Sequence, residues 1–292
     1  MSRLLSLPLL AAATLLAACS HLQETEGPPR KETVLAVTQD HQLIRFNAGQ
    51  PRRILDRKPL VGLPPGDSLV GIDFRVARGQ LYAVSHQGRL FTIDTASGRL
   101  TRVGSQDLPV TLNGRAIGFD FNPAADRIRL VSGDFNLRLH PDTGTAVDGD
   151  SAAPGFQPDG RLAYVAGDPG AGRRPDLVGA AYTYNKTDDK LTTNYAIDRT
   201  LGTLVMQGSL EGVQPVVSPN TGQLKTVGSL GLGPLSDAAF DIADIGNAAF
   251  AAVRTTSMPG TRLFEVDLAS GRARFIGTVG DGGPLRGLAV EP

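Results

Sequence analysis

A segment of this chain repeats about every 47 residues, and this repeat restricts the possible folds more than any other feature. Each copy contains two short apolar runs separated by a polar turn. Copies begin at Val34, Leu81 and Ile128, and a further copy begins near the C-terminus at Ala248. Periods of roughly 40 to 50 residues built from strands indicate the blades of a β-propeller. A β-sandwich, the other all-β fold considered, gives no reason for self-similarity at this period.

Two further elements keep the same period. A turn ending in glycine follows the second apolar run of most copies, because glycine tolerates the positive φ that ends such a turn. A short strand precedes each copy, and we expect it to be the innermost strand of a blade. The strands lie at 71–74, 118–121, 179–182, 239–242 and 287–290, and the turns lie at 47–49, 94–98, 141–144, 219–222 and 267–271. Five of each predict an all-β propeller of five four-stranded blades.

The two ends of the repeat complement each other. The N-terminal copy has no strand before it, and the strand 287–290 has no copy after it. We therefore predict that N- and C-terminal strands pair in one blade and close the ring, which leaves no open sheet edge. The run 161–166 also has the composition of a strand but fits none of the five blades. If it begins a blade of its own, the propeller has six.

The N-terminus has the features of an export signal. Residues 1–18 combine a cationic start with an apolar run that is too short to span a bilayer, and Cys19, the only cysteine, follows Leu16-Ala17-Ala18. This pattern resembles the bacterial lipoprotein signal, which implies cleavage before Cys19 and attachment of a lipid to its thiol. The polar, proline-containing residues that follow predict a flexible tether. The predicted divisions are a signal peptide at 1–18, a lipidated cysteine and tether at 19–32, and a single propeller domain at 33–292.

Such a signal predicts a protein of the bacterial cell envelope that is held to a membrane by its lipid. Ser20, rather than aspartate, follows the cysteine, and in Gram-negative lipoproteins that resemble this one such a residue favours the outer membrane. We expect the body to face the periplasm, with exposure at the cell surface as the alternative. Lysine plus arginine equals aspartate plus glutamate at 29 each. Because no net charge attracts nucleic acid, it is not predicted as a partner.

The sequence contains no recognisable catalytic constellation. Nucleophilic catalysis needs a serine or cysteine beside a histidine and an acid. The only cysteine is expected to carry lipid, and one of the four histidines, His21, lies in the tether. Signatures of serine hydrolases, zinc proteases, nucleotide-binding loops and cysteine metal clusters are absent from the sequence. The sequence therefore does not predict an enzyme.

The strongest candidates for a shared carboxylate site are Asp73, Asp120 and Asp241, which occupy the same place in three of the five inner strands. Ala181 and Ala289 stand there in the other two. If these strands line the central channel, the carboxylates gather near its axis, where oxygen ligands suit Ca²⁺. The competing interpretation is that each aspartate accepts backbone hydrogen bonds across a blade boundary, as repeat-building residues do. No other cofactor is predicted.

A second group of residues departs from the repeat by adding polar side chains. Departures from a repeat are better candidates for binding than the repeat itself. The competing interpretation is that Asn136 caps a turn and that Arg138 pairs with Asp142 or Asp134. The residues predicted to bind a ligand are Asp134, Asn136, Arg138, Tyr182 and Asn185.

The five residues lie in two segments, 134–144 and 181–185, whose sequences also resemble a known family. Over about residues 33–290 the chain resembles a family of exported bacterial domains catalogued only as a domain of unknown function. The resemblance implies a propeller-like fold and no established activity. Members of that family usually have two adjacent asparagines after Ala-Tyr-Thr, whereas the first of these positions is Tyr184 in this chain.

Together these features predict a lipid-anchored envelope propeller that acts as a binding or scaffolding module for a protein or a small polar ligand. The alternative is a metal-assisted hydrolase, glycosidase-like or lactonase-like, with the three aspartates at the channel mouth. A glycosidase would want aromatic platforms for its sugar, and the chain has no tryptophan. Convergence of the three carboxylates is the observation that would favour the hydrolase.

Overall fold

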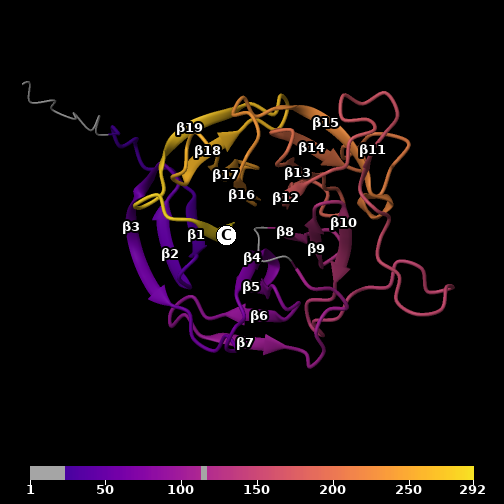
Figure 1. Ribbon diagram of the computed structural model, residues 1–292, viewed down its shortest axis with the longest axis horizontal. Helices are drawn as coiled ribbons and strands as arrows, with labels where there is room; N and C mark the ends of the chain where they lie inside the picture. The colour runs from indigo at the N-terminus through magenta and orange to yellow at the C-terminus, as the bar shows by residue number, and fades with distance from the viewer. Residues whose placement is uncertain (1–23, 113–116) are drawn as a thin grey trace, which may run out of the picture.

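The computed structural model describes residues 24–112 and 117–292, which form five small sheets arranged around a ring (Figure 1). Each sheet runs outward from the axis to the rim of the ring. Helical structure within these ranges is limited to two short 3₁₀ turns, η1 (Val76–Arg78) and η2 (Pro219–Thr221). No helix in the described ranges has the length and apolarity needed to cross a bilayer. The prediction of an all-β, five-bladed propeller is confirmed.

One blade contains both ends of the described chain. Its innermost strand is β20 (Leu285–Val290), followed outward by β1 (Thr33–Thr38), β2 (Gln42–Asn47) and β3 (Gln50–Pro59). Val34 pairs with Val290 and Ala36 with Leu288 in an antiparallel ladder. This pairing confirms that terminal strands close the ring, and we call this sheet the closing blade.

The other four blades follow in chain order around the ring. Two have four antiparallel strands, one has three, and one has five. The four-stranded blades are β4 (Leu69–Arg75), β5 (Gln80–Ser85), β6 (Leu90–Ile93), β7 (Leu100–Val103), and β16 (Asp237–Ile242), β17 (Ala249–Arg254), β18 (Arg262–Val266), β19 (Ala273–Thr278). The three-stranded blade consists of β8 (Gly118–Asn122), β9 (Arg127–Ser132) and β10 (Phe135–Leu139). The five-stranded blade consists of β12 (Leu177–Tyr182), β13 (Asn194–Asp198), β14 (Thr203–Gln207) and β15 (Gln223–Ser229), with β11 (Ala163–Tyr164) added at its rim.

The structure explains the unassigned run 161–166. Its strand β11 lies parallel to β15, with Ala163 opposite Gln223 and Tyr164 opposite Leu224. It therefore extends the rim of an existing blade, and the six-blade alternative is wrong. The Tyr164 hydroxyl donates to Asp198 Oδ2 at 2.7 Å, which fastens this added strand to its blade. The preceding blade has only three strands, because the chain leaves β10 after a single bridge between Leu139 and Ala146.

Glycines of the inner strands allow neighbouring blades to approach closely. A Cβ on Gly118 would lie 2.4 Å from Val131 Cγ2 and 2.6 Å from Ala180 Cβ. A Cβ on Gly71 would lie 2.7 Å from Phe119 Cβ. Because carbon atoms cannot pack at such distances, a larger residue would push the blades apart. Away from the axis, buried apolar side chains form five clusters, each packed between two neighbouring blades.

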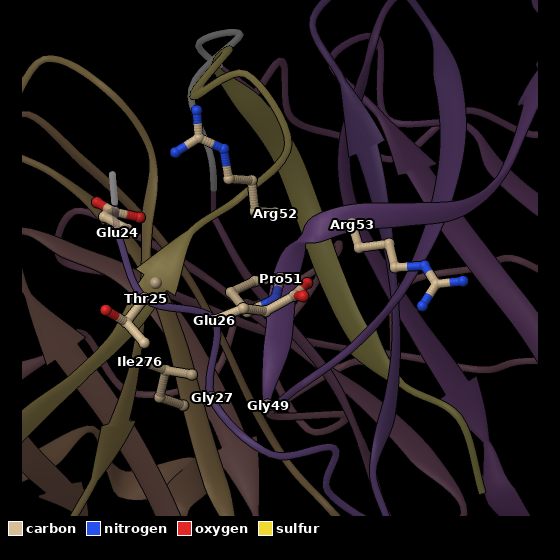
Figure 2. Close-up of a pocket in the computed structure, with 10 residues that line it drawn as sticks. Glu24, Thr25, Glu26, Gly27, Gly49, Pro51, Arg52, Arg53 and Ile276 are labelled. Carbon is tan, nitrogen blue, oxygen red and sulfur yellow. The ribbon is translucent and has the colours of Figure 1, made fainter. Parts of the chain in front are cut away.

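The residues expected to form a flexible tether are docked on the rim from Glu24 onward. The Glu24 carboxylate accepts from Thr278 N at 2.9 Å and from Thr278 Oγ1 at 2.7 Å. Arg30 forms an ion pair with Glu265, and its backbone N–H donates to Asn47 Oδ1 at 2.8 Å. The segment 24–28 lies between β3 and β19 (Figure 2). The flexible-tether prediction is therefore wrong for residues 24–32, because their polar groups find partners on two blades. Cys19 and the signal peptide lie outside the described residues.

Candidate metal centre

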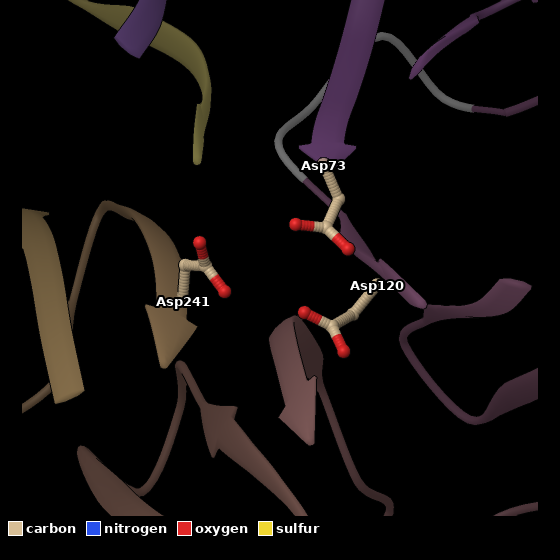
Figure 3. A group of neighbouring side chains, drawn as sticks. All are labelled: Asp73, Asp120 and Asp241. Atoms are coloured by element: carbon tan, nitrogen blue, oxygen red, sulfur yellow. The ribbon is translucent and has the colours of Figure 1, made fainter. Parts of the chain in front are cut away.

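Three aspartates from three inner strands meet near the ring axis. Asp73 lies on β4, Asp120 on β8 and Asp241 on β16, and all three are buried. One carboxylate oxygen from each lies within 4.8 Å of the others. Figure 3 shows the three carboxyl groups turned toward one another. The five-bladed geometry brings them together, because equivalent positions of every blade face the same axis.

The same carboxylates also join neighbouring blades. Asp73 Oδ2 accepts from Phe121 N at 2.7 Å, and Asp120 Oδ1 accepts from Tyr182 N at 2.9 Å. Asp241 Oδ2 accepts from Val290 N at 2.5 Å. In each case the donor belongs to the innermost strand of the next blade. The two interpretations of the sequence thus describe one arrangement, since each aspartate gives one oxygen to a blade boundary and turns its carboxyl group to the axis.

The alanines at the equivalent positions explain why three aspartates serve five blades. Ala181 precedes the blade of Asp241, and Ala289 precedes the blade of Asp73, so the inner N–H of these two blades receives no carboxylate from its neighbour. Ile242 N donates instead to Asp241 Oδ1 at 2.6 Å, and Phe74 N donates to Asp73. The three carboxylates therefore accept from all five inner N–H groups. Asp120 accepts from only one of the five N–H groups, so it has more free acceptor capacity for a ligand than Asp73 or Asp241.

Burial is the largest cause that raises the pKa of all three carboxyls, and the charges of neighbouring aspartates add to it for Asp73 and Asp120. Burial is the main cause for Asp73, followed by the charge of Asp241, and for Asp120 burial is followed by both neighbours. The pKa of Asp241 is raised to about 6, because backbone N–H bonds offset part of the effect of burial. Within the described ranges, no lysine or arginine forms an ion pair with the three.

Tyr184 is a residue at this site whose role the sequence did not reveal. Its backbone is fixed by Asn247, whose Oδ1 accepts from Tyr184 N at 2.8 Å and whose Nδ2 donates to Tyr184 O at 3.1 Å. Burial, and then the charges of Asp73, Asp120 and Asp241, raise the pKa of its phenol. The raised pKa keeps this phenol protonated. The available signal was the departure from the family pattern at this position.

The one serine–histidine–aspartate group near a loop end does not have the geometry of a catalytic triad. His86 Nδ1 lies 2.7 Å from Asp67 Oδ1 and 3.3 Å from Ser68 Oγ. In a triad the acid and the serine bond opposite ring nitrogens, so that the histidine can transfer the serine proton. Here both meet the same nitrogen, and Gln87 Nε2 lies 3.2 Å from the other. This group gives no support to a serine hydrolase.

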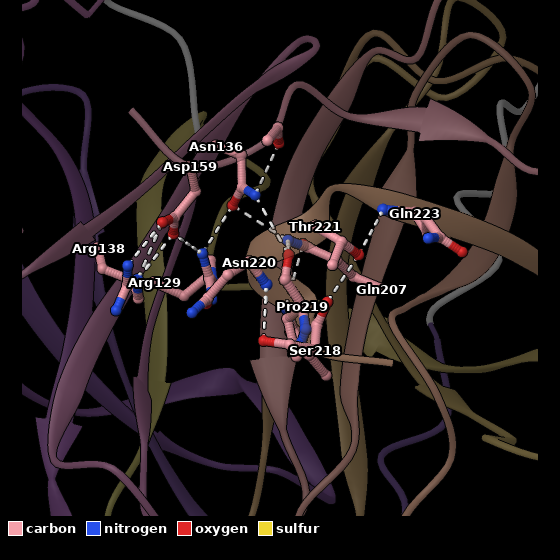
Figure 4. Close-up of polar contacts among 12 residues, drawn as sticks. Arg129, Asn136, Arg138, Asp159, Gln207, Ser218, Pro219, Asn220, Thr221 and Gln223 are labelled. Atoms are coloured by element: carbon pink, nitrogen blue, oxygen red, sulfur yellow. Dashed lines mark hydrogen bonds and ion pairs between the residues drawn. The ribbon is translucent and has the colours of Figure 1, made fainter. Parts of the chain in front are cut away.

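Three of the five predicted binding residues take part in a buried network (Figure 4 shows the contacts of Asn136 and Arg138). Its centre is Arg129, whose guanidinium donates to Asp159 at 2.7 Å, Asn136 Oδ1 at 2.7 Å and the Tyr182 hydroxyl at 3.2 Å. Arg138 donates to both oxygens of Asp159. Asn136 also donates to backbone carbonyls. The polar groups of these residues are thus engaged inside the protein, and their binding role stays a prediction.

The other two predicted binding residues lie apart from this network. Asp134 pairs with Arg161 and Arg174, each at 3.1 Å, beside an open cleft of about 770 Å³. Asn185 Nδ2 donates to Glu211 at 3.2 Å, and Asn185 Oδ1 accepts from Thr187 N at 3.0 Å, so the side chain caps a turn. The five residues therefore do not form one site.

Comparison with solved structures finds likenesses to distant proteins. A chain of a nidogen/laminin complex is 13% identical with a TM-score of 0.51, covering 89% of this chain and 98% of that chain. A glutaminyl cyclase from Myxococcus xanthus is 13% identical with a TM-score of 0.44, covering 82% of this chain and 83% of its own. A putative 6-phosphogluconolactonase from Bacteroides uniformis ATCC 8492 is 15% identical with a TM-score of 0.40, covering 85% and 82%. The likeness to the nidogen/laminin chain shows the fold alone, and the two likenesses with TM-scores below 0.5 carry no conclusion.

Comparison with protein families is more specific. No curated protein sequence matches significantly. A family model described as "Domain of unknown function (DUF4394)" matches residues 42–289. The match runs from β2 of the closing blade to β20, the innermost strand of the same blade. It agrees with the resemblance seen in the sequence, and this chain therefore belongs to the family of domains of unknown function described by that model.

Proposed function

We propose that this protein is a lipid-anchored binding module of the bacterial cell envelope and that its propeller holds a Ca²⁺ ion on the ring axis. The observation that carries the proposal is the convergence of three buried carboxylates that form no ion pair with a lysine or arginine of residues 24–112 and 117–292. Taking a carboxylate out of water is costly unless the charge is paired or neutralised. A bound divalent cation would neutralise the negative charge of the three carboxylates, which otherwise have to bind protons.

The donor set fits Ca²⁺ better than a transition metal. All three side chains offer oxygen, which hard cations prefer, and the site contains no histidine or cysteine. Oxygens bound at 2.3 to 2.6 Å to one Ca²⁺ lie at most about 5 Å apart, and these oxygens lie within 4.8 Å. Asp73, Asp120 and Asp241 would hold the ion, and water would complete its shell. Ca²⁺ would also tie three blades to one point on the axis.

The contacts support binding more than catalysis. One oxygen of each aspartate already accepts a backbone N–H across a blade boundary, so a proton-transfer cycle at these groups would disturb the ring. The metal-assisted hydrolase stays the alternative, because a Ca²⁺ ion beside the Tyr184 phenol could polarise a carbonyl or an acetal oxygen. Turnover that depends on both Ca²⁺ and Asp120 would favour this alternative.

The proposal is tested by thermal unfolding of protein stripped with EDTA and then titrated with Ca²⁺ or Mg²⁺. A ligand at a hundred times its dissociation constant adds about 2.7 kcal/mol, which for a domain of this size raises the Tm by about 5 to 10 °C. The Asp120→Asn variant keeps the acceptor for Tyr182 N but removes a charge, and it should lose this response. The exposed Asp189→Asn variant is the matched control and should keep it. Absence of a shift in the native protein, or equal shifts in native and Asp120→Asn protein, would overturn the proposed site.

Envelope anchoring is proposed from the sequence and has its own test. Cys19→Ala should abolish incorporation of labelled lipid and release the body from the membrane fraction. Fractionation of the native protein should place it in the outer membrane, facing the periplasm. Unchanged lipid labelling of the variant would contradict lipidation at Cys19, and inner-membrane retention would contradict the sorting expected from Ser20.

A further inference from the structure

The docked segment 24–32 fixes where the chain leaves the propeller. Glu24 is held by two hydrogen bonds from Thr278 on β19, and Gly27 O accepts from Gln50 Nε2 on β3 at 3.0 Å. Farther along, Arg30 pairs with Glu265, and its guanidinium stacks on Phe250 at 5.3 Å. The segment is thus attached at both of its ends. The exit point is the rim between β3 and β19 (Figure 2).

Covalent geometry then limits the distance to the proposed lipid anchor. Cys19 precedes Glu24 by five residues. A fully extended chain covers at most about 3.6 Å per residue, so the two Cα atoms lie no more than about 18 Å apart. A lipidated Cys19 lies at the membrane surface, and the rim at β3 and β19 must therefore lie close to that surface. A free tether of the whole segment 20–32 would impose no such orientation.

The strand at this exit point is unusually basic. Arg52, Arg53 and Arg57 on β3 are exposed, and Leu55 between them is 51% exposed. Arg52 and Arg53 line a cavity of about 300 Å³ together with the docked residues 24–27 (Figure 2). None of the three arginines forms an ion pair among the described residues, whereas Lys58 at the end of the strand pairs with Asp56.

Comparison among the blades shows that this charge is local to β3. The fourth strands of the three other blades that have one, β7, β15 and β19, carry one basic residue each, namely Arg102, Lys225 and Arg274. The remaining rim strands are β10, which carries Arg138, and β11, which carries no basic residue. Arg102 pairs with Asp107 and Arg274 pairs with Glu265. Basic residues on an edge strand can also prevent edge-to-edge aggregation. That general role does not explain why unpaired arginines gather on the one rim strand beside the chain exit.

We propose that β3 lies against the anionic phospholipid headgroups of the membrane that holds the lipid anchor. This proposal rests on the lipid anchoring proposed above. Arg52, Arg53 and Arg57 would contact phosphate oxygens, and Leu55 would reach the headgroup region. Basic residues beside an anionic membrane surface each strengthen binding roughly fivefold. The lipid keeps the protein on the membrane, while β3 sets its orientation, with the ring axis along the membrane and the opposite blades directed away.

The test uses the full lipoprotein reconstituted in vesicles of phosphatidylcholine with or without phosphatidylglycerol. Because lipid occupies the only native thiol, a single introduced cysteine can be labelled. Leu55→Cys places a fluorophore on β3, and Val216→Cys, at a position 68% exposed on a distant blade, is the reference. A quencher attached to the lipid headgroups should quench the Leu55→Cys label several-fold more than the Val216→Cys label, and more strongly with phosphatidylglycerol present.

A charge-reversal variant separates this proposal from its alternatives. Arg52→Glu, Arg53→Glu and Arg57→Glu together should abolish the excess quenching at position 55. The same change of net charge at exposed positions elsewhere, Arg173→Glu, Lys186→Glu and Lys190→Glu, should leave it in place. Equal quenching at both labels, or no effect of the β3 variant, would overturn the proposal.

Failure of the anchor itself would be visible separately. Intact mass shows whether Cys19 carries lipid, and flotation shows whether the protein stays with either kind of vesicle. If the chain carries no lipid, the anchor proposal fails, and co-sedimentation with phosphatidylglycerol vesicles then tests β3 alone. Three arginines predict binding on the order of a hundredfold stronger than for the Arg52→Glu, Arg53→Glu, Arg57→Glu variant. Equal sedimentation of the two would overturn the contact with anionic lipid.

Discussion

Two buried polar clusters in this propeller handle charge in opposite ways. In the network around Arg129, Asp159 accepts hydrogen bonds from both Arg129 and Arg138, and its carboxylate is buried beside them. On the ring axis, Asp73, Asp120 and Asp241 face one another and accept hydrogen bonds from backbone N–H groups. The network has a cation for its anion, whereas the axis gathers three anions.

The sheet register shows that this difference is not a matter of available residues. Asp120 on β8 lies directly opposite Arg129 on β9. The Arg129 guanidinium nevertheless turns away from the axis to Asp159, Asn136 and Tyr182. The Arg129 guanidinium is therefore available on the strand next to Asp120, but it pairs with Asp159. The negative charge of the network is thus balanced by its own arginines, whereas the negative charge on the axis is balanced by protons or by a ligand.

Removing the anion of the network should produce the largest effect. Asp159→Asn keeps the size of the side chain but leaves Arg129, which is 2% exposed, without an anionic partner. Breaking a buried pair in this way costs about 3 to 5 kcal/mol, or on the order of 10 °C in Tm for a domain of this size. Urea and thermal unfolding measure it, with the exposed Asp148→Asn as control. A loss below about 0.5 kcal/mol would mean that the network does not depend on its charge.

The axis should respond to pH in the opposite sense from an ordinary ion pair. The raised pKa of each axial carboxyl means that the folded, cation-free protein binds protons more tightly than the unfolded chain. Stability is therefore highest at low pH and is lost as pH rises from about 4 through about 6 and beyond, by on the order of 2 to 3 kcal/mol from Asp241 alone. Urea unfolding in EDTA from about pH 5 to about pH 8 measures the slope. Saturating Ca²⁺ should flatten it, and stability that rises with pH in EDTA would contradict this account of the axis.

Much of the fold and the axial cluster could be predicted because both follow from the repeat. Strands at one period make blades, and a shared position within the blades meets at the axis. Asp73, Asp120 and Asp241 could therefore be grouped without any structure. Their double role could not, because it depends on which inner N–H groups find a carboxylate on the preceding blade.

The network and the docked segment lie outside the repeat, and the sequence did not predict either. Asp159 comes from a long irregular loop, and its partners are distant in the chain. Arg129 did leave a signal, since it stands where other copies have Leu35, Tyr82 or Phe250. The contact of Glu24 with Thr278 joins positions 254 apart, and no local pattern indicates it. Such contacts depend on the closed ring, which places the two ends of the chain side by side.

Two substitutions at Asp120 should separate its charge from its hydrogen bond. Asp120→Asn still accepts from Tyr182 N and removes one of three like charges, so cation-free protein at about pH 8 should gain about 1 to 2 kcal/mol. Asp120→Ala removes the acceptor as well and leaves a buried N–H unsatisfied, which costs about 1 to 3 kcal/mol. Unfolding in EDTA compares the two variants. Equal effects would show that charge does not distinguish the axis from the network.

The smallest expected effect sharpens the comparison within the network itself. Arg138 donates to the same carboxylate as Arg129, but its side chain is 23% exposed against 2% for Arg129. Arg138→Gln leaves Asp159 paired with the buried arginine, and water can replace part of what is lost, so we expect a cost of about 1 kcal/mol. Arg129→Gln leaves Asp159 with only the outer arginine and removes donors to Asn136 and Tyr182, so it should cost about 3 kcal/mol or more. Chemical unfolding of both variants beside Asp159→Asn gives the order. If Arg138→Gln were the more damaging of the two, the charge balance of the network would depend on its solvent-facing side, and the contrast with the axis would have to be drawn from burial alone.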